Sequence, residues 1–230
     1  MEIATSTVVV TGANRGLGRA FATELVRRGS KVYAAARRPE LVDIPGVTVL
    51  PLDTTDEMSA DAAAEKASDA NILINNAASS AGGNLVTGDL AAIRDVMNTN
   101  YYGTLNMVRA FAPVLARNGG GAILNVLSGA AWESVPGNTA YAAAESAQWG
   151  LTNGIRLELA DQGTLVSALV LGLIATETLL TFAAEHDFPL PEEDLNEPEY
   201  LASLALDRLA AGDIQILDQS TIRTKRGLAE

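Results

Sequence analysis

The chain has 230 residues with a net charge of −12, one histidine and no cysteine. This length fits one α/β domain spanning residues 1–230. The acidic balance argues against nucleic acid or an anionic membrane as a partner, and the scarcity of histidine and cysteine argues against a metal site. We find no apolar run of membrane-spanning length and no secretory leader pattern, so we expect a cytoplasmic protein that binds a small molecule.

Predicted strands and helices alternate along the chain. We expect strands at 6–11, 31–36, 47–52, 71–75, 121–127, 164–171 and 214–217, and helices near 15–28, 57–67, 88–117, 138–161, 196–211 and 218–228. Such alternation predicts an α/β fold with a Rossmann-like, doubly wound parallel sheet in a single domain. The uncharged β-branched run at 6–11 is predicted to be a central strand. The proline- and acid-rich stretch 179–198 is predicted to be an exposed loop or lid.

A glycine-rich turn follows the first predicted strand and reads T-G-A-N-R-G-L-G over residues 11–18. Between a strand and a helix, such a turn offers backbone N–H groups at the helix start to a pyrophosphate. Gly12 would permit the tight turn, Gly16 the approach of the phosphates, and Gly18 close packing of the helix on the sheet. We therefore predict a dinucleotide site here. Its other members are Asn14, Arg15 and Leu17.

Charge at the end of the second predicted strand indicates which dinucleotide is bound. An acidic residue there would accept hydrogen bonds from a ribose diol, but this strand ends in Arg37 and Arg38. Guanidinium groups suit the 2′-phosphate of NADP, and Arg15 in the glycine turn could approach the same phosphate. We therefore predict NADP as the cofactor. The alternative is that Arg37 and Arg38 simply face solvent.

The order of these segments resembles the short-chain dehydrogenase/reductase family. The glycine turn has that family's T-G-x-x-x-G-x-G spacing, residues 75–78 read N-N-A-A beside its N-N-A-G, and residues 98–103 contain its N-x-x-G pattern. Ser128 precedes Tyr141 by the family's interval, and residues 171–176 resemble its P-G-x-x-x-T loop. The resemblance covers almost the whole chain, and it implies this fold and a nicotinamide-dependent oxidoreductase.

The resemblance also implies roles for residues of the cofactor site. It implies an adenine contact for Asp53, a position near the cofactor ribose for Asn76 and its neighbour Ala77, and a carboxamide contact for Thr176. Asp53 could equally cap the helix that begins near residue 56, because aspartate is a common N-cap.

The predicted catalytic residues match the family's pattern at every position except one. The resemblance implies that Tyr141 exchanges the proton, Ser128 hydrogen-bonds the substrate oxygen and Asn100 organises a water relay. The family's lysine, four residues after the tyrosine, lowers the tyrosine pKa by its charge, but this chain has Glu145 there. A carboxylate one helical turn from Tyr141 disfavours tyrosinate by on the order of 4 kcal/mol at about 4 Å and an effective dielectric of 20.

Glu145 leaves several functions open. The leading one is NADP-linked reduction of a carbonyl or oxidation of an alcohol in a weakened or rewired site, where lysine at 145 would raise ketone reduction by about 10²–10⁴. The alternative is a redox-neutral lyase, isomerase or cyclase, with Glu145 as the base and Tyr141 as the acid. A noncatalytic nucleotide-binding protein, a site disabled by substitution, and a glutamate that points into solvent also fit the pattern.

The helices predicted near 88–117 and 138–161 are rich in alanine and apolar residues. Small side chains permit close approach of helices, and the same helices form dimers in the family that the chain resembles. We therefore predict a homodimer or homotetramer.

Overall fold

Strands and helices alternate in a computed structural model that describes residues 1–134, 136–186 and 190–227. The strands are β1 (Thr7–Thr11), β2 (Lys31–Ala36), β3 (Thr48–Pro51), β4 (Ile72–Asn75), β5 (Ala122–Ser128), β6 (Leu165–Leu171), β7 (Leu173–Ile174), β8 (Leu195–Asn196) and β9 (Gln215–Leu217). The helices are α1 (Gly16–Arg27), α2 (Glu57–Lys66), α3 (Leu90–Met97), α4 (Thr104–Arg117), α5 (Thr139–Glu158), α6 (Glu177–His186), α7 (Pro198–Ala210) and α8 (Gln219–Gly227). A π-helical turn spans Asn98–Gly103, and short 3₁₀ turns span Ile3–Thr5, Pro39–Leu41, Gly129–Ala131 and Glu192–Asp194.

Seven strands form one parallel sheet in the order β3-β2-β1-β4-β5-β6-β9. The chain runs from β1 to one edge through β2 and β3, and then returns to β4 on the other side of β1. This reversal is the defining feature of a doubly wound sheet, and it opens a crevice at the C-terminal ends of the strands. The predicted Rossmann-like parallel sheet, with the strand at 6–11 in its interior, is confirmed.

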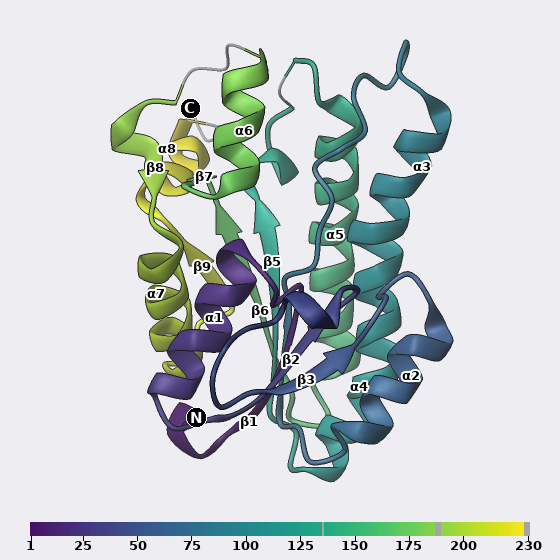
Figure 1. Ribbon diagram of the computed structural model, residues 1–230, viewed down its shortest axis with the longest axis vertical. Coiled ribbons are helices and arrows are strands. Elements are labelled where there is room, and N and C mark those ends of the chain that lie inside the picture. Colours follow the sequence, from purple (N-terminus) through teal and green to yellow (C-terminus); the bar gives the residue numbers. More distant parts are fainter. Residues whose placement is uncertain (135, 187–189, 228–230) are drawn as a thin grey trace.

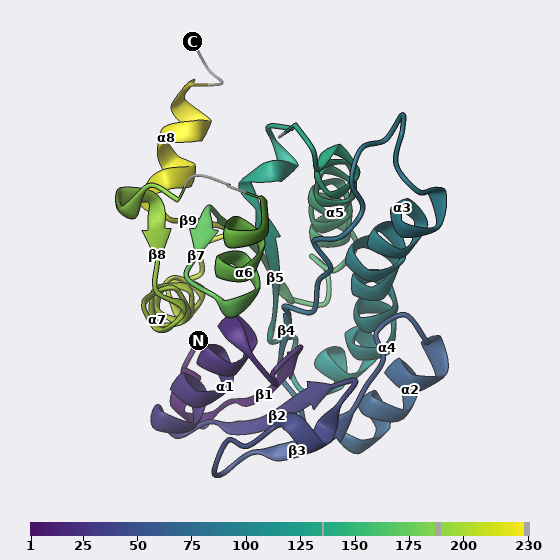
Figure 2. The same cartoon turned by 45° about the horizontal axis from the view of Figure 1, so that its top comes forward.

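Helices cover both faces of the sheet, with α1 and α7 on one side and α2, α4 and α5 on the other (Figure 1, Figure 2). Successive residues of a strand point to opposite faces, so β1, which is buried from Val8 to Thr11, divides its side chains between two cores. Val8 belongs to a cluster with Phe21 of α1 and Leu206 of α7. Val9 belongs to a second cluster that contains Phe111 of α4.

The single helix predicted at 88–117 is instead divided into three parts. Helix α3 ends at Met97, the π-helical turn follows, and α4 begins at Thr104. The π-helical turn carries the fully buried Asn100, and widened turns of this kind frequently mark functional sites. An irregularity this short leaves the apolar periodicity of the flanking helices visible, which explains why the sequence pattern indicated one helix.

The exposed loop predicted at 179–198 is wrong over its first half. Helix α6 continues to residue 186, and β8 pairs in parallel with β7 as a separate two-stranded sheet. The prolines of this stretch begin only at position 189, so nothing in 177–186 interrupts a helix. Residues 187–189 of the predicted loop lie outside the described residues. Within the described part of the chain, no helix is long and apolar enough to cross a membrane.

Candidate functional site

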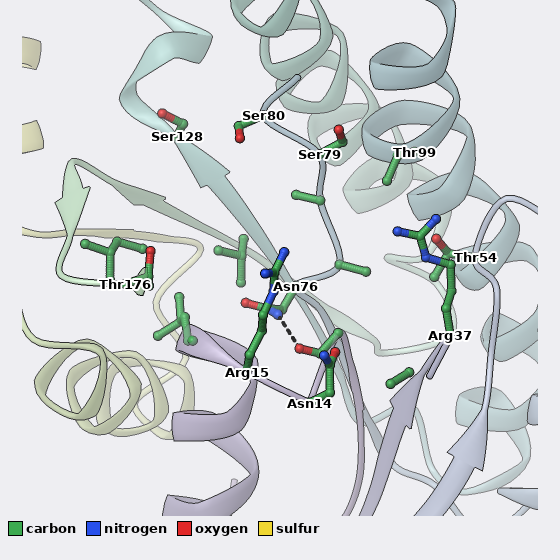
Figure 3. Close-up of a pocket in the computed structure, with 18 of the residues that line it drawn as sticks. Asn14, Arg15, Arg37, Thr54, Asn76, Ser79, Ser80, Thr99, Ser128 and Thr176 are labelled. Atoms are coloured by element: carbon green, nitrogen blue, oxygen red, sulfur yellow. Dashed lines mark hydrogen bonds between the residues drawn. The ribbon is translucent and has the colours of Figure 1, made fainter. Parts of the chain in front are cut away.

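A pocket of about 530 Å³ lies at the C-terminal ends of the parallel strands. Its walls come from the segments that follow β1 to β6, which is where doubly wound sheets bind ligands. Every predicted site residue lines this pocket except Gly18 and Asn100, which lie next to lining residues. Figure 3 shows Ser128 and Thr176 on one side of the pocket and Arg37 and Thr54 on the other.

The glycine turn is shaped by two residues with positive φ and by one close backbone contact. Gly12 and Gly16 have φ values of +67° and +53°, a region that favours glycine. A Cβ atom at Gly18 would lie 2.2 Å from the carbonyl oxygen of Gly12, so no side chain fits there. Helix α1 begins at Gly16, and its first N–H groups therefore open onto the pocket.

Asn76 holds the glycine turn in place. Its Nδ2 donates to the carbonyl oxygens of Thr11 at 3.0 Å and Gly12 at 3.5 Å, the latter drawn as a dashed line in Figure 3. The Thr11 hydroxyl accepts hydrogen bonds from the backbone N–H groups of Asn76 and Ala77 at 3.0 and 2.9 Å. The residues predicted near the cofactor ribose thus also join the ends of β1 and β4 rigidly.

Three arginines line the pocket with exposed side chains, namely Arg15, Arg37 and Arg38. Figure 3 shows the Arg15 and Arg37 side chains extending into the pocket from the glycine turn and from the end of β2. Among the described residues, no carboxylate forms a salt bridge with any of the three. In a chain with net charge −12, three cations left unpaired at one cavity indicate a site for an anionic ligand.

Asp53 lies in the pocket wall. Its Oδ1 accepts hydrogen bonds from the backbone N–H of Thr55 at 3.0 Å and from the Thr55 hydroxyl at 2.7 Å. The alternative role predicted for Asp53, capping α2, is wrong, because Asp56 is the N-cap and accepts from the N–H of Met58. Asp53 is therefore fixed by a local turn and faces the pocket.

Ser128 and Tyr141 meet at the far side of the pocket. Ser128 is the last residue of β5, and its hydroxyl lies beside the Tyr141 side chain from α5. Burial raises the pKa of Tyr141 above its ordinary value, and the neighbouring Glu145 carboxylate raises it further, whereas the nearby Ser128 hydroxyl lowers it. The phenol therefore stays protonated at neutral pH.

Glu145 is 1% exposed, so a glutamate that points into solvent is ruled out. Its Oε1 accepts a hydrogen bond from Asn100 Nδ2 at 2.8 Å, and its Oε2 accepts one from the backbone N–H of Ser128 at 2.7 Å. Burial raises the pKa of Glu145 to about 7, although both hydrogen bonds oppose the rise. The carboxylate thus joins the π-helical turn to the end of β5, and it titrates near neutrality.

Asn100 uses its whole carboxamide within the protein. Its Oδ1 accepts from the N–H of Ser79 at 2.8 Å, and its Nδ2 donates to the Ser79 carbonyl at 3.1 Å as well as to Glu145. Ser79, Ser80, Thr54 and Thr99 also line the pocket, and sequence reasoning missed them. Isolated serines and threonines in loops carry no periodicity or spacing that distinguishes a wall residue from any other loop residue.

No group of three or more histidine, aspartate or glutamate side chains that could hold a metal ion occurs in the described part of the chain. The polar side chains that line the pocket are the arginines, several hydroxyls and carboxamides, and the carboxylates of Asp53, Glu145 and Glu177. The arginines suit a phosphate-bearing organic ligand.

The family model described as short chain dehydrogenase matches residues 6–186. The NADPH-dependent 1-acyldihydroxyacetone phosphate reductase of Schizosaccharomyces pombe is 32% identical over 179 residues, covering 74% of this chain and 60% of that protein. The 3-ketodihydrosphingosine reductase of Bacteroides thetaiotaomicron is 31% identical over 156 residues, covering 66% of this chain and 58% of that protein. The chain therefore spans about three fifths of the length of these two curated relatives.

A solved short chain dehydrogenase from Burkholderia cenocepacia J2315, in complex with NADP, is similar over the whole chain. The TM-score is 0.91 at 34% identity, and the alignment covers 100% of this chain and 94% of that one. The family match covers the glycine turn, the π-helical turn, Ser128 and Tyr141. The chain belongs to the short-chain dehydrogenase family.

Proposed function

We propose that the protein is an NADP-linked oxidoreductase that reduces a carbonyl group, or oxidises the corresponding alcohol, on a small organic substrate. The observation that carries the proposal is one pocket with unpaired arginines at one end and the Ser128–Tyr141 pair at the other. Arg37 follows β2 and Ser128 ends β5, so a dinucleotide could extend across the sheet between them. The NADP-bound relative of 34% identity and the relative named NADPH-dependent support this choice of cofactor.

The residues present fit that cofactor. The pocket reaches Gly12 and Gly16 at the start of α1, where backbone N–H groups would hold a pyrophosphate, and Arg37, Arg38 and Arg15 would hold the 2′-phosphate. Thr176 lies next to the glycine turn, since a Cβ atom built on Gly16 would be only 3.3 Å from Cγ2 of Thr176. NADPH, when bound, would supply the hydride.

Tyr141 and Ser128 would act on the substrate oxygen. As hydride reaches the carbonyl carbon, the oxygen becomes an alkoxide, which needs a proton and a hydrogen-bond donor. Tyr141 is a neutral phenol at physiological pH and would donate the proton, while the Ser128 hydroxyl would donate a hydrogen bond. A tyrosine held in its protonated form is suited to the reductive direction more than to removing a proton from an alcohol.

The geometry argues against the redox-neutral alternative. A general base must reach its substrate, but Glu145 is 1% exposed and is tied to the π-helical turn and to the end of β5 through both of its oxygens. We propose instead that Glu145 positions Ser128 and Asn100. A noncatalytic scaffold is also disfavoured, because such a protein would have no need of a buried, hydrogen-bonded Glu145 beside a tyrosine that lines the pocket.

Arg37 provides the sharpest test of the cofactor. Arg37→Ala should weaken NADPH binding by about 1–3 kcal/mol, because it removes a charge-assisted hydrogen bond, and should leave NADH binding almost unchanged. Fluorescence titration of both cofactors measures this. Arg19→Ala is the matched control, since Arg19 pairs with Asp43 outside the pocket. If Arg37→Ala weakened the binding of NADPH and NADH equally, Arg37 would not contact the 2′-phosphate.

We also propose that the protein self-associates through α4 and α5. Two large apolar side chains on this side are exposed, Leu157 of α5 by 80% and Tyr102 of the π-helical turn by 51%. Burying them in a second copy would remove apolar surface from water. Light scattering at micromolar concentration should give the mass of a dimer or tetramer, and a monomer would end this proposal.

A further inference from the structure

Asp218 is a buried carboxylate that lies in the chain between β9 and α8 and is 1% exposed. Its Oδ1 accepts three hydrogen bonds from the first turn of α8. The donors are the Ser220 hydroxyl at 2.8 Å, the Thr221 N–H at 2.7 Å and the Thr221 hydroxyl at 2.8 Å. This oxygen therefore caps the helix and satisfies N–H groups that would otherwise lack partners.

The other oxygen of Asp218 binds a different part of the chain. Oδ2 accepts from the N–H of Gly172 at 2.9 Å and from Nδ2 of Asn196 at 3.1 Å. Gly172 immediately precedes β7, and Asn196 ends β8, where it pairs in register with Ile174. One oxygen thus holds both strands of the small β7–β8 sheet, and the Asn196 carbonyl continues the link by accepting from the N–H of Ala175 at 2.9 Å.

The segment that starts at Gly172 reaches the cofactor pocket. Ile174, Thr176 and Glu177 line the pocket, and Thr176 lies against the glycine turn. Figure 3 shows Thr176 at the edge of the pocket, on the same side as Ser128. We call residues 172–177 the Thr176 arm. Its position over the pocket depends on how its beginning is anchored.

Helix α8 and the beginning of the Thr176 arm are in close contact. A Cβ atom at Gly172 would lie 2.0 Å from the Ser220 hydroxyl oxygen, which leaves no space for a side chain. Arg223 of α8 also pairs with Asp194, just before β8. The C-terminal helix therefore packs against Gly172 through Ser220 and pairs with the residue before β8 through Arg223, with Asp218 at the junction.

We propose that Asp218 is a positioning residue for the cofactor site: by dividing its two oxygens between α8 and the β7–β8 sheet, it holds the Thr176 arm against the glycine turn. The role rests on the proposed function, since it assigns the arm to NADP binding. A buried carboxylate with five donors is stabilised by all of them together, and hydrogen bonds to charged groups are among the stronger ones. Loss of an arm-side donor should therefore loosen the arm, whereas loss of a helix-side donor should loosen only α8.

Two variants separate these sides. Asn196→Ala removes the arm-side amide, whose Nδ2 also donates to the carbonyls of Leu173 and Asp194. Thr221→Val removes a helix-side hydroxyl of similar size, which also donates to the Val170 carbonyl of β6, and keeps the N–H that Asp218 caps. We expect Asn196→Ala to raise the dissociation constant of NADPH about tenfold, as fits the loss of the charge-assisted hydrogen bond to Asp218. Thr221→Val should change it by less than about twofold, although the melting temperature should fall in both variants.

Amide hydrogen exchange followed by mass spectrometry gives a second readout that does not need the cofactor. Asn196→Ala should speed exchange at residues 172–177, and Thr221→Val should speed it within 219–227. Should Asn196→Ala prove too unstable, Asn196→Asp keeps the shape and sets a second carboxylate against Asp218, so it should give the same pattern.

The outcomes distinguish the two proposals. If the wild-type protein fails to bind NADPH, the proposed function is wrong, and the exchange pattern alone decides the role of Asp218. The role of Asp218 is overturned if the arm-side variant leaves exchange at 172–177 unchanged. It is also overturned if both variants weaken NADPH binding to the same extent.

Discussion

Replacing Tyr141 with phenylalanine is expected to lower the rate constant for carbonyl reduction by about 10²–10⁴, the usual contribution of a general acid. The variant removes only the hydroxyl, and this hydroxyl is the group that the structure places in the pocket beside Ser128. In the proposed reaction, its neutral form at physiological pH would supply the proton that the developing alkoxide needs. Steady-state kinetics with NADPH and a reducible carbonyl measures the effect on kcat.

The same variant has an internal control in cofactor binding. The Tyr141 ring packs in a small apolar cluster with Val96, Ala140 and Ala144, and phenylalanine preserves that packing. The dissociation constant of NADPH and the melting temperature should therefore stay close to those of the wild type. A kcat within about threefold of the wild type would show that another group donates the proton.

Replacing Glu145 with lysine is expected to lower ketone reduction. The sequence pattern alone predicts the opposite, a rise in ketone reduction. Both partners of the carboxylate, Asn100 Nδ2 and the Ser128 N–H, are donors, and lysine has no acceptor to offer them. Two buried donors would lose their partner, at roughly 1–3 kcal/mol each. We therefore expect Glu145→Lys to lower the free energy of unfolding and to lower ketone reduction by displacing Ser128.

Glu145→Gln tests the same contacts with a smaller change. It also shows how the contribution of Glu145 to stability depends on pH. In the folded protein the pKa of Glu145 is raised from 4.5 to about 7, so the folded state holds this proton where the unfolded state has lost it. The contribution of the protonated group to stability is therefore complete below pH 4.5 and is lost as the pH rises through 7, by an amount on the order of 3 kcal/mol.

Urea unfolding of the wild type and of Glu145→Gln at several pH values measures this dependence. The stability of the wild type relative to the variant should fall between pH 5 and 8, because glutamine does not titrate. Other titrating groups are common to both proteins and cancel in the difference. A difference that stays constant across this range would mean that Glu145 titrates as it does in the unfolded chain.

The sheet and the glycine turn could be predicted from the sequence because their signals are local. An uncharged β-branched run fixes β1, and the glycines that follow it meet a backbone requirement that other residues do not satisfy. Gly12 and Gly16 do have positive φ, and Gly18 does lie against backbone. These features depend on neighbours within a few residues, so a single sequence reveals them.

The role of Glu145 could not be predicted, because its partners are remote in the chain. The sequence places it one helical turn from Tyr141 and so indicates only repulsion between two potential negative charges. Asn100 lies 45 residues before Glu145 and the Ser128 N–H 17 residues before it, and only the folded sheet and the π-helical turn bring them together. Helix α6 could not be predicted for a different reason. The prolines of 179–198 all lie beyond the end of α6, but they give the whole stretch the composition of a loop.

Transfer of deuterium from cofactor to substrate tests the central claim most directly. NADPH labelled with deuterium at the nicotinamide carbon that donates hydride would be mixed with a panel of aldehydes, aliphatic ketones, aryl ketones and keto esters. We predict that the wild type forms an alcohol carrying one deuterium on its carbinol carbon, detected by mass spectrometry, and that Tyr141→Phe binds NADPH equally well but forms far less. A wild-type protein that binds NADPH tightly and transfers deuterium to no carbonyl in the panel would contradict the account.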